Sequence, residues 1–147
     1  MGFGWINLFG AVIVIVMMIP NIVYAARNND EENLCTNKVM NLIEQIGRYA
    51  CIVLMWFPLL VWKFGFASVL EMLVYLIGNG LMLFVYLLVF ARYLKEKTSQ
   101  RAMILAVLPA CIFLLSGLLL RHWLLVLSAL LFAIGHIYVT KQNLDAS

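Results

Sequence analysis

Most of this sequence belongs to five apolar stretches that are separated by short polar links. Each stretch is close to the roughly 20 residues that an α-helix needs to cross a bilayer, and little sequence remains for a separate soluble domain. Hydrophobic residues make up 65% of the chain and charged residues 12%, whereas globular domains are about half apolar and a quarter charged. The sequence therefore predicts an all-α integral membrane helical bundle with five transmembrane helices in a single domain, residues 1–147, with spans at about 3–26, 42–63, 68–94, 102–120 and 123–140.

The last two stretches are separated only by Arg121 and His122. One continuous helix from Ala102 to Thr140 would be about 58 Å long, nearly twice the thickness of the hydrocarbon core, with Arg121 at its centre. A charge at that depth is costly. We therefore predict a helical hairpin that turns at residues 120–122.

Lysine and arginine residues are distributed unequally between the two ends of the predicted spans. Lys63 and Arg121 fall at one end, and the other end holds Arg27, Lys38, Arg92, Lys95, Lys97, Arg101 and Lys141. Cytoplasmic flanks of membrane proteins carry the excess of these residues. The bias predicts an N-terminus outside and a cytoplasmic C-terminus, which agrees with an odd number of spans. In a bacterium, the protein would lie in the cytoplasmic membrane.

The second stretch carries two opposite charges, Glu44 and Arg48, four residues apart and hence on one face of a helix. Fourteen uncharged residues separate Arg48 from Lys63, so the two charges are about 22 Å apart along the helix axis, less than the thickness of the core. Charges within the hydrocarbon region usually face the bundle interior in pairs. We expect Glu44 and Arg48 to form such a pair. The helix itself should begin near Thr36 or Asn37.

The third stretch carries a stripe of polar and aromatic residues at helical spacing. Its members share one face of the helix: Glu71, Tyr75, Asn79, Met82, Tyr86, Val89 and Tyr93. Such a stripe serves helix packing and hydrogen bonding in most bundles, and a substrate path is the alternative. Glu71 should lie at the interface, where it can meet Lys63 across the preceding turn.

With this threading, polar residues of several spans reach one depth on the cytoplasmic side. Asn21 lies about 9 Å from the level of Arg27, and His136 about 8 Å from the level of Lys141. Glu44 and Arg48 fall in the same layer, and His136 shares a stripe with Ser128, Phe132 and Thr140. The candidate ligand-binding residues are Asn21, Glu44, Arg48, Asn79, Tyr86 and His136. The alternative is a purely structural Glu44–Arg48 salt bridge, with His136 capping a backbone carbonyl group.

The sequence contains no HExxH, GxSxG or P-loop motif, and its cysteines and histidines lack the spacing of a zinc site. We predict no cofactor, no metal and no catalytic residue. The basic residues sit at helix ends without interleaved aromatics, which favours the lipid bilayer as partner and excludes nucleic acid. Ala129 and Ala133 offer a close-packing face, which predicts a homo-oligomer or a membrane-protein partner.

Three classes of function remain. The first is a non-catalytic subunit or regulator within a membrane complex, which the lack of motifs favours. The second is a transporter or permease component that binds an anionic or protonatable small ligand at the cytoplasmic-side cluster. The third is an intramembrane enzyme acting on a lipid-like substrate, for which acid–base groups exist without a recognisable arrangement.

Overall fold

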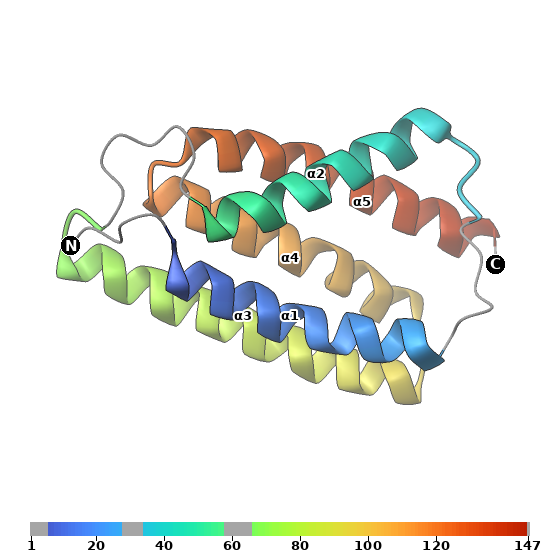
Figure 1. Cartoon of the computed structure of the whole chain (residues 1–147). Coiled ribbons are helices and arrows are strands. Elements are labelled where there is room, and N and C mark those ends of the chain that lie inside the picture. The colour runs from blue at the N-terminus through green and yellow to red at the C-terminus, as the bar shows by residue number, and fades with distance from the viewer. Residues whose placement is uncertain (1–5, 28–33, 58–65, 147) are drawn as a thin grey trace.

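The computed structural model describes residues 6–27, 34–57 and 66–146, and this part of the chain is all-α with five helices. Figure 1 shows them as a single bundle. The predicted all-α fold is confirmed. In chain order the helices are α1 (Leu8–Arg27), α2 (Lys38–Trp56), α3 (Val69–Lys95), α4 (Ser99–Leu119) and α5 (Trp123–Ala146).

Four of the described helices, α1, α3, α4 and α5, are long and apolar enough to cross a membrane. Their outer faces carry large exposed apolar side chains, such as Ile22, Leu70, Leu81 and Ile134. A soluble protein does not expose so much contiguous apolar surface, whereas lipid acyl chains solvate it. The chain is therefore a multi-pass membrane protein.

Side-chain caps explain where three of the helices begin. The side chain of Asn37 accepts hydrogen bonds from the backbone N–H groups of Val39 and Met40 at the start of α2. Ser68 caps α3, and Thr98 caps α4, in the same way. Such caps satisfy N–H groups that have no partner within the helix. The predicted starts at Asn37 and Ser68 are confirmed.

Helix α2 ends at Trp56, before the Lys63 that we expected as its end. Phe57 is already extended, with φ −118° and ψ 121°. Since Pro58 follows it in the sequence, the α conformation is disfavoured at Phe57. Residues 58–65, which include Lys63, lie outside the described part of the chain.

The predicted hairpin between α4 and α5 is confirmed. Arg121 adopts a left-handed conformation with φ 52°, and the N–H group of His122 donates to the carbonyl oxygen of Gly117 at 2.8 Å. The guanidinium group of Arg121 lies 3.2 Å from the carboxylate of Glu71 at the start of α3. Glu71 therefore pairs across the bundle with Arg121.

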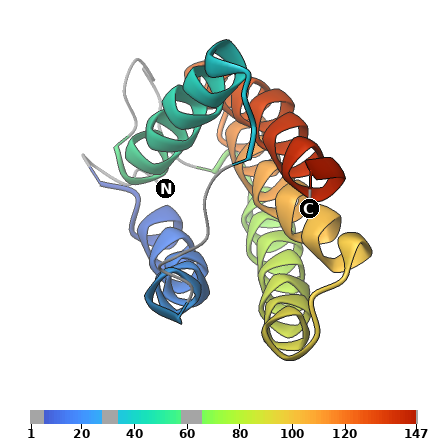
Figure 2. The same cartoon turned by 90° about the vertical axis from the view of Figure 1, so that its right-hand side faces the viewer.

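The helices form a continuous layer in which α2 packs on α5, α5 on α4, and α4 on α3, while α1 packs against α3 and α2. Figure 2 shows this order from the end where α1 and α3 finish. Helices α1 and α2 meet at the opposite end, where the Asn7 N–H group donates to the Trp56 carbonyl oxygen at 2.8 Å. From there they separate toward Arg27 and Lys38 (Figures 1 and 2).

Two glycines let α2 and α5 approach each other backbone to backbone. A Cβ atom added to Gly135 would lie 2.6 Å from the backbone nitrogen of Glu44, and one added to Gly47 would lie 2.6 Å from that of Phe132. This reciprocal contact fixes the register between the two helices. Ala129 of α5 is also buried inside the chain, at 1% exposure. It is therefore not available as the oligomer contact that the sequence suggested.

Candidate functional site

The carboxylate of Glu44 lies at the centre of a charged cluster between α2 and α5. Its Oε1 atom accepts a hydrogen bond from the guanidinium group of Arg48, one turn along α2. Nδ1 of His136, on α5, lies 3.2 Å from the same oxygen. The Glu44 side chain is buried at 7% exposure, whereas that of Arg48 is 44% exposed. His136 thus contacts the carboxylate, and not a backbone carbonyl group as in the structural alternative.

Packing around His136 explains why its ring meets Glu44. The imidazole stacks on the ring of Phe132, with centroids 4.8 Å apart and planes 15° from parallel. The neighbouring Gly135 lies against the backbone of Glu44 itself. A longer side chain at position 135 would separate the two helices and move Nδ1 out of reach of the carboxylate.

A second polar contact joins α1 to α3 at the same end of the bundle. The amide nitrogen of Asn21 donates to the hydroxyl oxygen of Tyr86 and to the carbonyl oxygen of Met17, both at 2.8 Å. Tyr86 is buried. Two of the predicted residues, from helices far apart in the sequence, therefore form one interhelical hydrogen bond, as polar residues in membrane bundles commonly do.

A cavity of about 340 Å³ brings the two contacts together. Four of the predicted site residues line it: Asn21, Arg48, Tyr86 and His136. Glu44 lies behind Arg48 and His136, where it orients both. Most of the remaining wall is apolar, with contributions from all five described helices, including Met17, Ile52, Phe90, Leu105 and Phe113.

Asn79, the sixth predicted residue, does not reach this cavity. Its amide nitrogen donates to the hydroxyl oxygen of Ser116 on α4 at 3.1 Å, and both side chains are fully buried. The Asn79 side-chain oxygen has no hydrogen-bond partner among the described residues. This part of the stripe on α3 therefore holds α3 to α4.

Alanine at Ser116 is expected to lower the free energy of unfolding by about 1 kcal/mol, because Asn79 loses its partner inside the bundle. Unfolding in mild detergent with increasing dodecyl sulfate measures the change. Ser128→Ala is the matched control, since Ser128 donates to the Leu124 carbonyl oxygen of its own helix. Equal losses in the two variants would contradict an interhelical role for Ser116.

The cluster offers the chemistry of anion recognition. A guanidinium group can hold a carboxylate or phosphate with two parallel hydrogen bonds, and an imidazole can donate a further one. Arg48 and His136 present these groups to the cavity, and the buried Glu44 keeps them in place. Within residues 6–27, 34–57 and 66–146, no three His, Cys, Asp or Glu side chains gather as metal ligands would.

The glycine pair is the part of the site that the sequence did not reveal. Gly47 and Gly135 carry no functional group, and nothing in the local sequence says which helices they bring together. The stripe on the fifth stretch, in contrast, did anticipate three residues of the cavity wall: Phe132, His136 and Thr140.

Comparison with known proteins returned no match: no protein-family model, curated protein or solved structure is significantly similar to the chain. On these observations it is a small multi-pass helical membrane protein.

Proposed function

We propose that this protein is a non-catalytic membrane component that binds a small molecule with an acidic group in the cavity beside Arg48 and His136. The observation that carries the proposal is the joining of an apolar cavity of about 340 Å³ to these two basic side chains. Small-molecule sites have volumes of about 300–1,000 Å³, mostly apolar walls and a few oriented polar groups. Binding of this kind suits a permease component and equally a ligand-sensing subunit of a complex.

The test compares Arg48, which lines the cavity, with Arg121, which does not. The side chains of Arg48 and Arg121 are both 44% exposed, and each pairs with a glutamate. Native mass spectrometry of protein purified in mild detergent should find a bound acidic molecule in the wild type and in Arg121→Met. The double variant Glu44→Gln with Arg48→Met should lose it, since the cavity then lacks its guanidinium group.

The double variant is chosen so that no unpaired carboxylate is left in the bundle. Equal occupancy in all three proteins would contradict binding at this cluster.

We include α2 as a fifth span in this proposal, although its charges keep it below the hydropathy of the other four helices. Its 19 residues extend about 28 Å, close to the thickness of the hydrocarbon core. Glu44 is buried and paired with groups on α2 and α5, which is how intramembrane charges are accommodated. Four residues before α2 begins, the Leu34 N–H group donates to the Asn143 side-chain oxygen on α5 at 2.6 Å, which supports an antiparallel course of α2 along α5.

The proposed orientation places the basic end of the bundle in the cytoplasm. The Lys97 ammonium group lies 5.1 Å from the centre of the Tyr24 ring, so the end of α1 and the α3–α4 link share one end of the bundle. Arg121 and Glu71 pair at the other end. Lysine and arginine are thus concentrated at a single end, as the positive-inside rule requires of the cytoplasmic side.

Cysteine labelling with a membrane-impermeant reagent checks this orientation. Single cysteines at positions 2 and 121 should react in intact cells, and those at positions 97 and 147 only after permeabilisation. The native cysteines Cys35, Cys51 and Cys111 must first be replaced by alanine. Labelling of positions 97 and 121 from the same side would exclude the five-span arrangement.

A further inference from the structure

The side chains that line the cavity differ in burial from helix to helix. Its wall on α3, α4 and α5 includes buried aromatic side chains, among them Tyr86, Phe113 and Phe132. On α1 and α2 the lining side chains of Met18 and Arg48 remain 38% and 44% exposed. We assign the mouth of the cavity to the space between these two helices, because they carry these exposed lining side chains and separate toward Arg27 and Lys38 (Figure 1).

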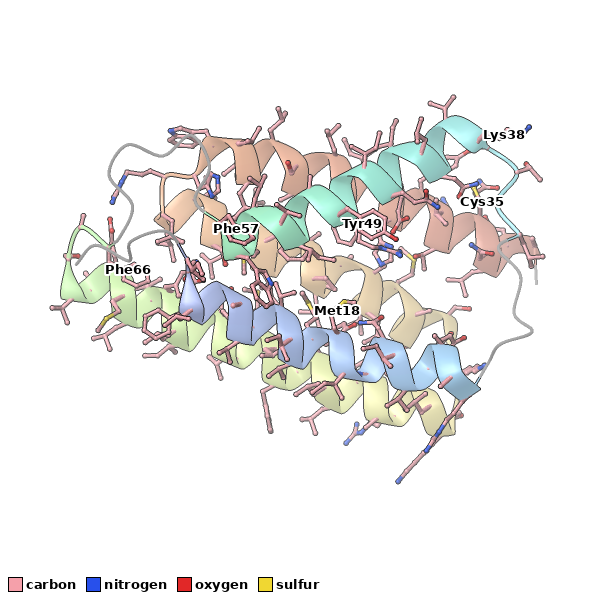
Figure 3. The ribbon with its side chains drawn as sticks, in the orientation of Figure 1. Met18, Cys35, Lys38, Tyr49, Phe57 and Phe66 are labelled. Atoms are coloured by element: carbon pink, nitrogen blue, oxygen red, sulfur yellow. The ribbon has the colours of Figure 1, made fainter. Side chains whose placement is uncertain are left out.

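This mouth faces the hydrocarbon region of the bilayer. Met18 is nine residues from Arg27, or about 14 Å along α1, and Arg48 is ten residues from Lys38, or about 15 Å along α2. Both distances place the mouth within a core that is about 30 Å thick, away from the cytoplasmic ends of the two helices. Figure 3 shows Met18 and Tyr49 on the two sides of the space between α1 and α2, and Tyr49 is exposed there.

The lining of the cavity combines a few polar groups with a mostly apolar wall. Arg48, Tyr86 and His136 supply polar groups, as does Asn21. Phe90, Leu105 and Phe113 also line the cavity and offer no hydrogen-bond partner to a ligand. A volume of about 340 Å³ is near the lower limit of small-molecule sites and too small for a two-chain phospholipid.

We infer that the ligand is a single-chain amphiphile with an acidic head group, and that it enters from the bilayer between α1 and α2. This inference rests on the proposed function and names the class of ligand and its route. The head group binds Arg48 and His136. The chain packs against the apolar wall, and any length that exceeds the cavity extends through the mouth among the lipid chains. An apolar ligand in the bilayer reaches such a mouth without crossing water.

The first experiment separates the contributions of chain and head group. The full-length protein in phosphatidylcholine nanodiscs is incubated with dodecanoate, dodecanol or acetate, and bound molecules are counted by native mass spectrometry. Dodecanoate should bind at least about tenfold more tightly than acetate, since each buried methylene group adds to affinity. It should also bind more tightly than dodecanol, which lacks the charge that Arg48 recognises.

The outcomes of this experiment distinguish the two proposals. If acetate binds as tightly as dodecanoate, and its binding depends on Arg48, the proposed function stands and the amphiphile is excluded. If dodecanol equals dodecanoate, the acidic head group is excluded. If none of the three binds and no acidic molecule is found in the protein purified from its own membranes, both proposals fail.

The second experiment tests the route. In a Cys111→Ala background, Met18→Cys and Tyr49→Cys are joined by a bifunctional methanethiosulfonate reagent before dodecanoate is added. Uptake should slow by at least about tenfold, and reduction of the link should restore the rate that the same variant had before linking. The matched control joins Leu118→Cys to Trp123→Cys, two exposed positions at the α4–α5 turn. Equal uptake rates in the two linked proteins would exclude a route between α1 and α2.

Discussion

Alanine at Gly135 is expected to lower the free energy of unfolding by about 3 kcal/mol. The added Cβ atom would lie 2.6 Å from the backbone nitrogen and 2.7 Å from the Cα atom of Glu44. Backbone atoms cannot rotate away as the end of a flexible side chain can, so α2 and α5 must separate. The separation also withdraws His136 from the Glu44 carboxylate. Unfolding in mild detergent with increasing dodecyl sulfate measures the loss.

Gly80 provides the matched control within the same bundle. A Cβ atom added there meets nothing within 4 Å, so Gly80→Ala should leave stability unchanged or raise it by up to about 1 kcal/mol through helix propensity. Gly47→Ala should resemble Gly135→Ala, since its Cβ atom would meet the backbone of Phe132. If Gly135→Ala proves as stable as Gly80→Ala, the close contact between α2 and α5 does not exist.

The second large effect concerns the charge pair. Arg48→Met is expected to cost about 3 kcal/mol, at the low end for a broken buried pair, because Glu44 keeps His136 as a partner. Glu44→Gln alone should cost less, since the half-exposed Arg48 can turn its charge toward the nearest water. The double variant should recover much of the loss of Arg48→Met, because no buried carboxylate remains.

Arg121→Met serves as the control for this series. Arg121 is as exposed as Arg48, but its partner Glu71 is partly exposed as well, and an exposed ion pair contributes at most about 1 kcal/mol. The difference in stability loss between Arg48→Met and Arg121→Met therefore reports the effect of a buried carboxylate partner, and not the mere presence of a salt bridge. If Arg48→Met and Glu44→Gln both leave stability unchanged, the pair faces water at the membrane surface.

Local features of the helices could be predicted from the sequence. The apolar stretches, the caps at Asn37 and Ser68 and the turn at Arg121 each depend on residues that are close together in the chain. The Glu44–Arg48 contact is of the same kind, since its partners are one helical turn apart. The early end of α2 also had a local signal in the Phe57–Pro58 pair, which we did not use.

The level along the bundle axis at which residues of different helices lie could be predicted from the sequence. The faces with which the helices contact one another could not. Counting residues from the basic ends placed Asn21, Glu44, Arg48 and His136 in one layer. The same count puts Asn79 about 24 Å from Lys95, which separates it from that layer. Which helix faces meet is decided by packing, however, and the sequence of one helix does not reveal its partner. The contact of Gly47 with the Phe132 backbone is of this kind.

The pairing of Glu44 with His136 has a consequence for the order in which the chain assembles. Helix α2 leaves the ribosome long before α5, and each of its central charges costs about 2.5–3.5 kcal/mol to insert into the bilayer. The helix that shields Glu44 and supplies its second partner is the last to be synthesised. If α2 spans the bilayer, as we propose, its insertion is complete only after α5 has been made. A chain truncated before Trp123 is then expected to retain three helices that are apolar enough to span and a second helix without its charge partner on α5.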